Sequence, residues 1–528
     1  MFDIVIRNGN VLDGSGAEAR RLDVGVRGGK IEALGDLSEA EAIEALDAGG
    51  KTVCPGFLDL HRHADAALFR PGYGDCDLFQ GITTIGNGNC GLSLAPQAGP
   101  FREAIGGYLK PVTGDFTGIP VDTFGAYMSA LKGQALPVNA LMLAGSGTIR
   151  ASVAGFQKLR LADEDFAAIH QRLEQALADG AGGVSLGLGY APECYYTRSE
   201  LIRALRPIQN TDTVLSVHMR EEAMKLLSSI DEMITVAKAL HVPLQISHLK
   251  ASGRENWGKL APQALDRIAR AREEGVDVAC DVYAYTAGST QLIHILPPEF
   301  LQGGPAAITE RLRDSSARKR LLDRLEKGRD FDNYAYLVGW ENIFISALKR
   351  PEDAVYVGKS IAEAAGDADP ATFAMDLLMR NDCEVTMIDF ITSEEDIGLI
   401  LQSPFAYSIS DATFPTGGKL HPRVYGAFSQ VIETYVNRRH DLTLAQAVNR
   451  MTLRPADRYG LKNKGRITMG ADADILVFDP KRVHVTATYD RPDQRAEGMD
   501  HVIVNGRIAL REGKLTGVQA GNVLGGKK

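Results

Sequence analysis

The stretch "GFLDLHRHAD", residues 56–65, is an apolar run that ends in two histidines one residue apart. Side chains alternate along a β-strand, so His61 and His63 face one way and Arg62 faces the other. In a parallel β/α barrel, the carboxyl ends of the strands meet at the mouth, where the site is assembled. Two imidazoles on one face of a strand end can therefore share one metal.

Seven further apolar runs follow, separated by segments with helical periodicity such as "DEDFAAIHQRLEQALADG" (163–180). Eight strands alternating with helices predict an α/β fold, a closed (β/α)8 TIM barrel over residues 57–463. The gap of about 290–404 is too long for a simple connection and contains the extended stretches "NIFISA" and "EVTMIDF". We therefore expect an inserted subdomain between barrel strands 7 and 8. The predicted strands are GFLDLHRH (56–63), ITTIGNGNC (82–90), VNALMLAGSG (138–147), AGGVSLGLGY (181–190), TVLSVHMR (213–220), PLQISHLK (243–250), VDVACDVYAY (276–285) and FAYSISDAT (405–413).

The two ends of the chain share a pattern of short alternating strands around turn residues. "VIRNGNVLDGSG" (5–16) at the start is echoed by "HVIVNGRIALREGKLTG" (501–517) near the end. A lone hairpin is marginally stable, so joining the two ends buries their apolar faces most economically. Residues 1–56 and 464–528 are predicted to form one β-sandwich domain.

Composition narrows the class of protein. The chain has 528 residues, of which 67 are acidic and 58 basic, and this negative balance opposes binding to nucleic acid. Six cysteines without paired spacing disfavour a disulfide framework or a zinc ribbon. The strand-like start "MFDIVIRNGN" and the lack of an apolar run of about 18 residues predict a cytoplasmic protein without a membrane span. A homo-oligomer is compatible with the sequence.

Other predicted strands also end in residues that can bind a metal: Cys90, His218, His248 and Asp411. Taken singly, a histidine is usually a hydrogen-bonded structural residue, a buried cysteine a small hydrophobe and an aspartate a helix cap. Four of the eleven histidines, however, lie at barrel strand ends, and burying so many polar groups together requires a cation. Nitrogen, sulfur and oxygen ligands favour zinc over iron or manganese. Asp411 is the expected catalytic base.

Several longer motifs carry a resemblance to a known family. "GKTVCPGFLDLHRHAD" and "GADADILVFDP" are similar to the start and end of the amidohydrolase superfamily. The motifs "QGITTIGNGNCGLSLAP", "SVHMREE", "ISHLKASGRENWGK", "DVYAYTAGST" and "HPRVYGAF" resemble, within it, the N-acyl-D-amino-acid deacylase (D-aminoacylase) family. The resemblance covers essentially the whole chain and implies a (β/α)8 barrel with a β-sandwich from both termini. It also implies zinc-dependent hydrolysis of a small-molecule N-acyl-D-amino acid to a carboxylate and a free D-amino acid.

The resemblance also implies roles for the ligands. Cys90, His218 and His248 match the residues that hold one tightly bound zinc. His61 and His63 match those that face a second position, which binds metal more weakly or stays empty. The aspartate of "SISDAT" (408–413) matches the family's catalytic aspartate, which takes a proton from the attacking water and delivers it to the leaving amine nitrogen.

Substrate contacts follow from the same resemblance. Lys250, Tyr283 and Ser289 match residues that bind the substrate's α-carboxylate, since one cation and two hydroxyls form an anion cradle. Arg423, in "HPRVYGAF", is expected to add to it. Without the resemblance, Lys250 would be interpreted as a solvated loop residue and Tyr283 as packing against the barrel wall.

Some positions depart from the family pattern. Arg62 stands between the two histidines where a small residue is usual, Ala64 replaces an acidic residue, and Ala412 replaces a glycine. The segment "YAPECYYTRSE" (190–200), with Cys194, Tyr195 and Tyr196, indicates an atypical side-chain pocket.

Three alternatives remain open on the same barrel. A cyclic-amide hydrolase of the hydantoinase or dihydroorotase kind usually needs a lysine on strand four, and "GGVSLGLGY" (182–190) has none. A D-dipeptidase on the same barrel is the second alternative. A catalytically silent barrel used for binding would be expected to lose ligands or the base, and none is lost.

Overall fold

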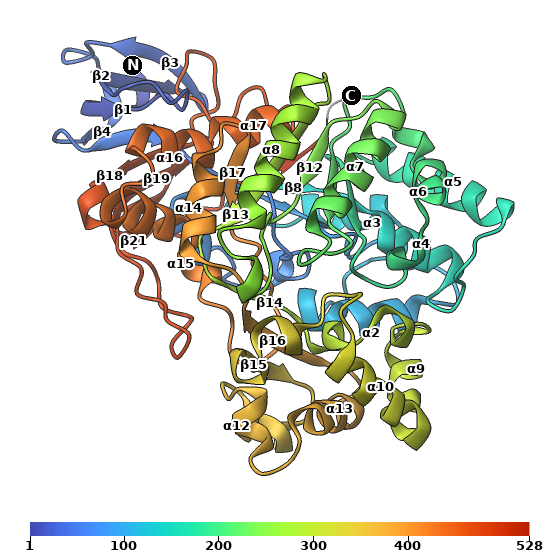
Figure 1. The fold of residues 1–528 in the computed structure, drawn as a ribbon. Helices are drawn as coiled ribbons and strands as arrows, with labels where there is room; N and C mark the ends of the chain where they lie inside the picture. Colours follow the sequence, from blue (N-terminus) through green and yellow to red (C-terminus); the bar gives the residue numbers. More distant parts are fainter. Residues whose placement is uncertain (527–528) are drawn as a thin grey trace.

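The computed structural model describes residues 1–526 of the chain and has an α/β fold with nine short parallel strands at its centre (Figure 1). One parallel sheet has the order β6-β7-β8, and a second has the order β9-β10-β11-β12-β13-β17. Each of the eight apolar runs contributes a strand, and the run at 138–147 forms two. The strands are β6 (Phe57–Asp59), β7 (Ile82–Asn87), β8 (Asn139–Met142), β9 (Ala144–Gly145), β10 (Val184–Gly187), β11 (Leu215–His218), β12 (Leu244–Ile246), β13 (Val278–Tyr283) and β17 (Ala406–Ile409).

Backbone contacts join the two parallel sheets at both sides. Only Leu143 separates β8 from β9, and its N–H donates to the carbonyl of Asn87. On the other side, the N–H of Asp411 donates to His61 O at 2.9 Å, and His63 and Thr413 form an isolated parallel β-bridge. The eight runs therefore surround one core, and the strand ends that carry the candidate ligands lie together.

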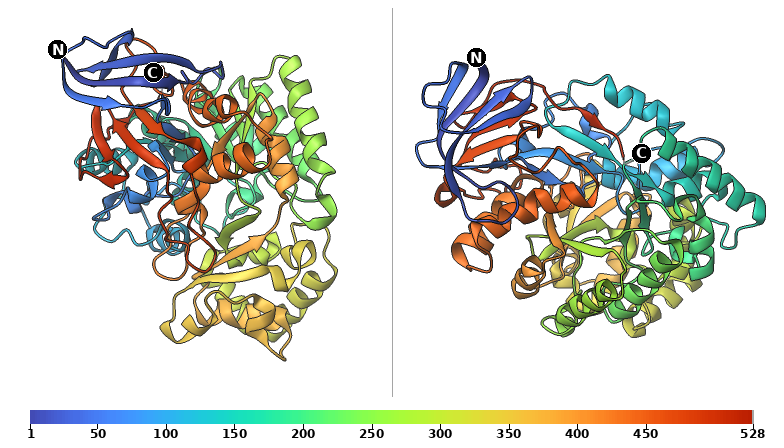
Figure 2. Two further views of the ribbon diagram at one scale, coloured as in Figure 1. Left: turned by 90° about the vertical axis from the view of Figure 1, so that its left-hand side faces the viewer. Right: turned by 90° about the horizontal axis from the view of Figure 1, so that it is seen from above.

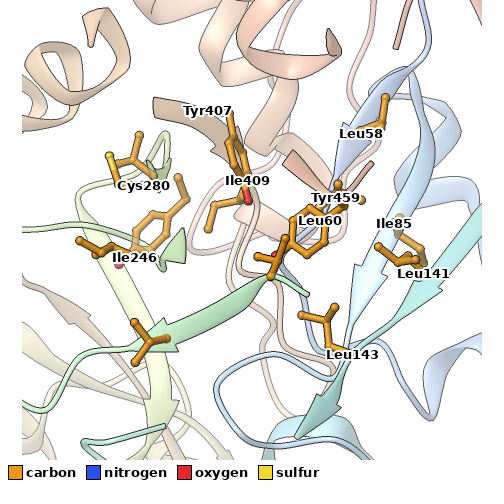
Figure 3. Packing of buried hydrophobic residues seen from close by; sticks show 14 of the residues in the cluster. Leu58, Leu60, Ile85, Leu141, Leu143, Ile246, Cys280, Tyr407, Ile409 and Tyr459 are labelled. Atoms are coloured by element: carbon orange, nitrogen blue, oxygen red, sulfur yellow. The ribbon is translucent and has the colours of Figure 1, made fainter. Parts of the chain in front are cut away.

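The core is built from strands that are far apart in the sequence. Figure 3 shows Leu58, Ile85, Leu141, Ile246 and Ile409 within a single cluster of buried apolar side chains. Strands β10, β11 and β12 are buried at every position, as expected for parallel strands that are covered on both faces.

Amphipathic helices cover the parallel strands. The predicted helical segment 163–180 forms α5 (Asp163–Ala178), whose buried residues Phe166, Ile169, Leu173 and Ala176 recur every three or four positions. Its first turn is closed by Asp165, whose carboxylate accepts the N–H of Ala162 at 2.7 Å. Other covering helices are α7 (Leu226–Leu240), α8 (Leu260–Glu273), α14 (Glu394–Gln402) and α16 (Leu444–Met451).

Both ends of the chain form one nine-stranded sheet. Strand β5 pairs antiparallel with β18, which joins the first part of the chain to the last, and the two parts lie together in both views of Figure 2. The turn between β19 and β20 has positive φ at Asn505 (46°) and Gly506 (76°), as a two-residue hairpin requires. The strands are β1 (Phe2–Val11), β2 (Arg20–Arg27), β3 (Lys30–Gly35), β4 (Ala42–Asp47), β5 (Thr52–Pro55), β18 (Ile475–Phe478), β19 (Met499–Val504), β20 (Arg507–Arg511) and β21 (Lys514–Leu515).

The last described strand departs from the prediction that all of residues 464–528 belong to the terminal sheet. Strand β22 (Val523–Leu524) pairs in parallel with β8, and the N–H of Ala140 donates to Asn522 O. At the start of β8, which is an edge of the sheet, backbone N–H and C=O groups need hydrogen-bond partners. The returning chain supplies these partners. Residues 527–528 lie outside the described part.

The segment between β13 and β17 has its own sheet and its own core. Strands β14 (Ala287–Gln291), β16 (Val385–Phe390) and β15 (Ile343–Leu348) pair antiparallel in that order. The helices α9 (Gly304–Arg313), α10 (Ser315–Lys327) and α13 (Pro370–Arg380) pack on a second apolar cluster. This region lies at the bottom of Figure 1. Among the described residues, no helix is long and apolar enough to cross a membrane.

Candidate metal centre and active site

The candidate ligands lie where the parallel strands end. His61 and His63 follow β6, Cys90 follows β7, His218 ends β11, and His248 follows β12. All five side chains are buried. The structure therefore brings together residues that are up to 187 positions apart in the sequence.

Two groups of three ligands share the cysteine. The ligand atoms of His61, His63 and Cys90 lie within 4.8 Å of one another, and so do those of Cys90, His218 and His248. The Cys90 Sγ is 3.3 Å from His61 Nε2 and 3.5 Å from His248 Nε2. His218 Nδ1 is 3.0 Å from His248 Nε2. Cys90 is thus placed to serve either group.

The donor set fits a soft divalent cation. Burial lowers the pKa of His61 and of His218 well below the usual value, which keeps these imidazoles in the neutral form that binds metals. Burial also raises the pKa of the Cys90 thiol, so a thiolate at this position requires a cation beside it. Within residues 1–526, the Nδ1 atoms of His61 and His63 have no hydrogen-bond partner. Nitrogen and sulfur donors together suit zinc.

Backbone strain is concentrated in this cluster. Cys90, His248 and Asp411 have φ of 54°, 36° and 52°, in the left-handed region that side chains with a Cβ seldom adopt. Each residue lies just beyond the end of a strand. The end of β10 also lies very close to the loop that carries Cys90, since a Cβ on Gly187 would lie 2.2 Å from Cys90 O. A side chain at Gly187 would displace the loop that carries the cysteine.

Asp411 lies against the first group. Its Oδ1 is 3.5 Å from His61 Nε2 and 3.5 Å from His63 Nε2, while its Oδ2 is 3.1 Å from the Arg423 guanidinium. Burial alone would raise the pKa of Asp411, but the charge of Arg423 and the neighbouring histidines together outweigh burial and hold the pKa well below the usual value. Asp411 is therefore an ionised carboxylate, ready to accept a proton.

Two carboxylates that the sequence did not single out support the ligands. Glu222 Oε1 is 2.9 Å from His248 Nδ1, and Asp281 Oδ1 accepts the backbone N–H of His248 at 2.6 Å. A carboxylate on the second ring nitrogen fixes the orientation and tautomer of a ligating histidine. Both residues lie in motifs that mark the family, "SVHMREE" and "DVYAYTAGST", and that was the available signal. Burial raises the pKa of Asp281 to about 7.

The predicted substrate residues surround one small cavity beside the ligands. Lys250, Tyr283 and Ser289 line a cavity of about 40 Å³ together with Asp411. Lys250 Nζ is 2.6 Å from Glu222 Oε2, and this carboxylate raises the pKa of Lys250 above its usual value even though burial opposes the charge. The Tyr283 hydroxyl has no hydrogen-bond partner among residues 1–526. One ammonium and two hydroxyls thus face the same space.

Arg423 occupies a different position from the other predicted substrate residues. It is fully buried, pairs with Asp411, and donates from Nη2 to the carbonyl of Ser289 at 3.2 Å. Its guanidinium lies 4.9 Å from the centre of the Tyr283 ring. In this arrangement, Arg423 holds the base and two walls of the cavity in place.

Two groups of candidate metal ligands at the mouth of a parallel α/β core, with an ionised carboxylate beside them, define the class: a metal-dependent amidohydrolase. The family model "Amidohydrolase family" matches residues 396–510. D-aminoacylase from Alcaligenes xylosoxydans xylosoxydans is 34% identical over 99% of this chain and 97% of that protein. The chain belongs to the D-aminoacylase family, which confirms the resemblance found in the motifs.

Solved structures agree with this assignment. A D-aminoacylase structure, described as having a binuclear metal centre with one-metal activation and second-metal attenuation, has a TM-score of 0.83 at 31% identity and covers 99% of this chain and 100% of that chain. N-acyl-D-glutamate deacylase from Bordetella bronchiseptica, complexed with zinc and a phosphonate mimic of the tetrahedral intermediate, has a TM-score of 0.82 at 31% identity, with 99% of each chain covered.

Proposed function

We propose that the protein hydrolyses the amide bond of N-acyl-D-amino acids in a zinc-dependent reaction, releasing a carboxylate and a D-amino acid. The observation that carries this proposal is the position of Asp411, 3.5 Å from both His61 and His63 and on the wall of the cavity that Lys250 lines. A proton acceptor, a metal site and an anion-binding cation thus meet in one small space. The named relatives act on N-acyl-D-amino acids or carry that activity in their names.

The five ligands divide between two metal positions. Cys90, His218 and His248 would hold the tightly bound zinc, and His61 and His63 would face a second, weaker position that shares Cys90. A bound zinc supplies a Lewis acid that polarises the scissile carbonyl and acidifies water. The binuclear centre described for a D-aminoacylase structure supports a second position.

The chain's own residues carry the proton and the substrate. Asp411 takes the proton of the attacking water and delivers it to the nitrogen of the leaving amine, as an ionised carboxylate can. Lys250, Tyr283 and Ser289 hold the α-carboxylate with one charge-assisted contact and two hydroxyls. This cradle fixes the substrate amide beside Asp411, and this positioning lowers the activation free energy of hydrolysis.

We propose the domain division expected from the sequence, with two changes. The β-sandwich takes residues 1–56 and the segment from 464 to β21, the (β/α)8 barrel takes the rest of 57–463 and is joined by β22, and the inserted subdomain runs from β14 to β16, because α14 covers the barrel strands. The pairing of β5 with β18 and the separate sheet of β14, β15 and β16 support this division. The six cysteines are all unpaired, which supports a reducing compartment, the cytoplasm.

A substrate panel tests the proposal. Zinc-loaded protein is assayed with N-acetyl-D- and N-acetyl-L-amino acids, with D-dipeptides and with hydantoin, and free amine is measured. Hydrolysis of the linear D-amides with little turnover of the others supports the proposal. Faster turnover of hydantoin would indicate a cyclic-amide hydrolase, and faster turnover of D-dipeptides a dipeptidase. Metal-loaded protein that is inactive on every member would indicate a binding role.

A further inference from the structure

The arginine between the two histidines is bound on the face opposite to the metal site. Arg62 is fully buried, and its Nε donates to Asp59 Oδ2 at 2.8 Å. Its Nη1 donates to the Tyr73 hydroxyl at 3.0 Å and forms an ion pair with Asp77. The guanidinium also lies 5.7 Å from the centre of the Phe414 ring. Arg62 therefore contacts β6, the segment that follows it, and the turn after β17.

Asp59 connects this arginine to the turn that carries the base. Its Oδ1 accepts the N–H of Ser410 at 2.9 Å, and its Oδ2 accepts the Ser410 hydroxyl at 2.5 Å. The same hydroxyl accepts the N–H of Ala412 at 3.1 Å. Asp59, which Arg62 binds in turn, thus holds Ser410 directly and Ala412 through the Ser410 hydroxyl.

Such support is required because Asp411 is strained. Its φ of 52° is in the left-handed region, and a strained backbone persists only where the surroundings fix it. Asp59 accepts two hydrogen bonds from Ser410 while buried, and a buried carboxylate needs a cation such as Arg62 beside it. Without the arginine, the Asp59 carboxylate would be buried with no cation beside it, and Ser410 would lose a fixed anchor.

We propose that Arg62 is a positioning residue for the base, which it holds in place through Asp59 and Ser410. This inference rests on the proposed function, in which Asp411 moves the proton. It assigns a role to a residue that departs from the family pattern. The alternative is that Arg62 only neutralises buried carboxylates, in which case its replacement lowers stability and leaves turnover unchanged.

Two variants and their combination test the connection. Arg62→Lys keeps the charge but not the forked contacts, and Ser410→Ala removes the hydroxyl but leaves the arginine and its carboxylates. We expect each variant to lower kcat by about 10-fold with KM changed by less than about twofold, because a small displacement of a catalytic group is costly. Since both act through one chain of contacts, the double variant should lose about as much as either single variant.

A matched control variant distinguishes an effect on the position of Asp411 from a general loss of protein stability. Arg458 is partly buried, pairs with the exposed Asp277 at 2.7 Å, and donates to the carbonyl of Leu244 at the opposite ends of the parallel strands. Arg458→Lys should lower Tm and leave kcat within about twofold of the original. If Arg62→Lys lowers Tm but not kcat, or if the losses multiply in the double variant, the positioning role is wrong.

Crystal structures give a readout that does not depend on activity. In Arg62→Lys and Ser410→Ala, the Asp411 carboxylate should move away from His61 and His63, while in Arg458→Lys it should not. An unmoved carboxylate in both site variants would overturn the inference. If the unmodified protein hydrolyses no N-acyl-D-amino acid, the proposed function fails, and the structures still decide the role of Arg62.

Discussion

The carboxylate of Glu222 links His248 to Lys250: one oxygen lies 2.9 Å from His248 Nδ1 and the other 2.6 Å from Lys250 Nζ. A candidate metal ligand and the cation of the proposed carboxylate cradle are therefore held by one buried side chain. The ion pair lowers the pKa of Glu222 and raises that of Lys250, so both groups stay charged although they are buried. In the proposed function, metal binding and substrate orientation depend on the same residue.

Replacing Glu222 with glutamine should weaken both functions. The variant removes the charge that orients His248, so zinc affinity should fall about 10- to 100-fold, as loss of such a partner typically does. KM should rise because Lys250 loses its anchor. Zinc affinity is measured by competition with a chelator. Glu232→Gln, which cuts a pair with Arg220 outside the ligands, is the control and should leave zinc affinity unchanged.

Replacing Asp411 with asparagine should separate metal binding from turnover. The amide cannot accept the proton, so kcat should fall by about 100-fold or more while zinc stays bound. Zinc content is determined by atomic emission alongside kcat. Near-normal turnover in this variant would remove Asp411 from the proton-transfer role.

Replacing Cys90 with alanine should lower the zinc content itself. Cys90 belongs to both ligand groups, so its loss leaves each group with two histidines. We expect less than about one zinc per chain after dialysis, since two protein ligands rarely retain the metal. Cys280→Ala, at a buried cysteine outside either group, is the control. An unchanged zinc load in Cys90→Ala would contradict its assignment.

The positions of the candidate ligands at strand ends were predictable from the sequence because these residues follow short apolar runs. His61, His63, Cys90, His218 and His248 each lie at or just past a strand end, a position that a parallel core brings to one edge. The supports of these ligands follow no such local rule. Asp59 binds Ser410, which is 351 positions away, and only the closure of β6 against β17 makes that pair possible.

Other misses have similar physical causes. The return of β22 to β8 involves only two paired residues, too few to give a strand pattern. Arg62 was identified as a departure from the family, but its partner Asp77 comes from a helix of four residues, α1 (Asp75–Leu78), that no periodicity predicts. Position at a strand end is encoded locally, whereas the partner of a buried charge depends on tertiary packing.

Glu193 provides a test of pH-dependent stability. Burial raises the pKa of Glu193 to about 7, although its Oε2 accepts the N–H of Gly187 at 2.7 Å. Because the folded-state pKa lies above the unfolded value of about 4.3, the folded state keeps a proton that the unfolded state loses, and stability falls as pH rises from about 4 to 7. At pH values below both pKa values, Glu193 is protonated in the folded and the unfolded state, so its titration no longer changes the stability.

The variant Glu193→Gln lacks this titration. Its free energy of unfolding, relative to that of the original protein, should increase by roughly 1–2 kcal/mol between pH 5 and pH 7, which is below the limit of about 1.4 kcal/mol per pH unit. Urea unfolding at the two pH values measures the change. Glu174→Gln, on the exposed face of α5, should show no such trend. A constant difference across this range would show that Glu193 titrates normally.

A second cavity of about 120 Å³ adjoins the candidate ligands, and the residues that line it indicate which substrate side chains fit. Its walls include Leu188, Leu296, Leu301 and Phe331, and it shares His218 and Glu222 with the smaller cavity. Its cation is not available to a ligand, because four of the five N–H groups of the Arg220 guanidinium are used: two donate to Glu232, at 2.9 and 3.0 Å, and two donate to the carbonyls of Cys194 and Tyr196, at 2.8 and 2.9 Å. Burial lowers the pKa of His294, on the same wall, to about 3, so this imidazole is neutral.

A carboxylate side chain in this cavity would be buried without a partner, at a high cost in free energy. We therefore expect kcat/KM for N-acetyl-D-leucine or N-acetyl-D-methionine to exceed that for N-acetyl-D-glutamate and N-acetyl-D-aspartate by about 100-fold or more. Leu296→Arg would supply the missing cation and should narrow the ratio, whereas Leu296→Met should preserve it. Equal or greater activity on the acidic substrates in the unmodified protein would show that the substrate side chain lies elsewhere.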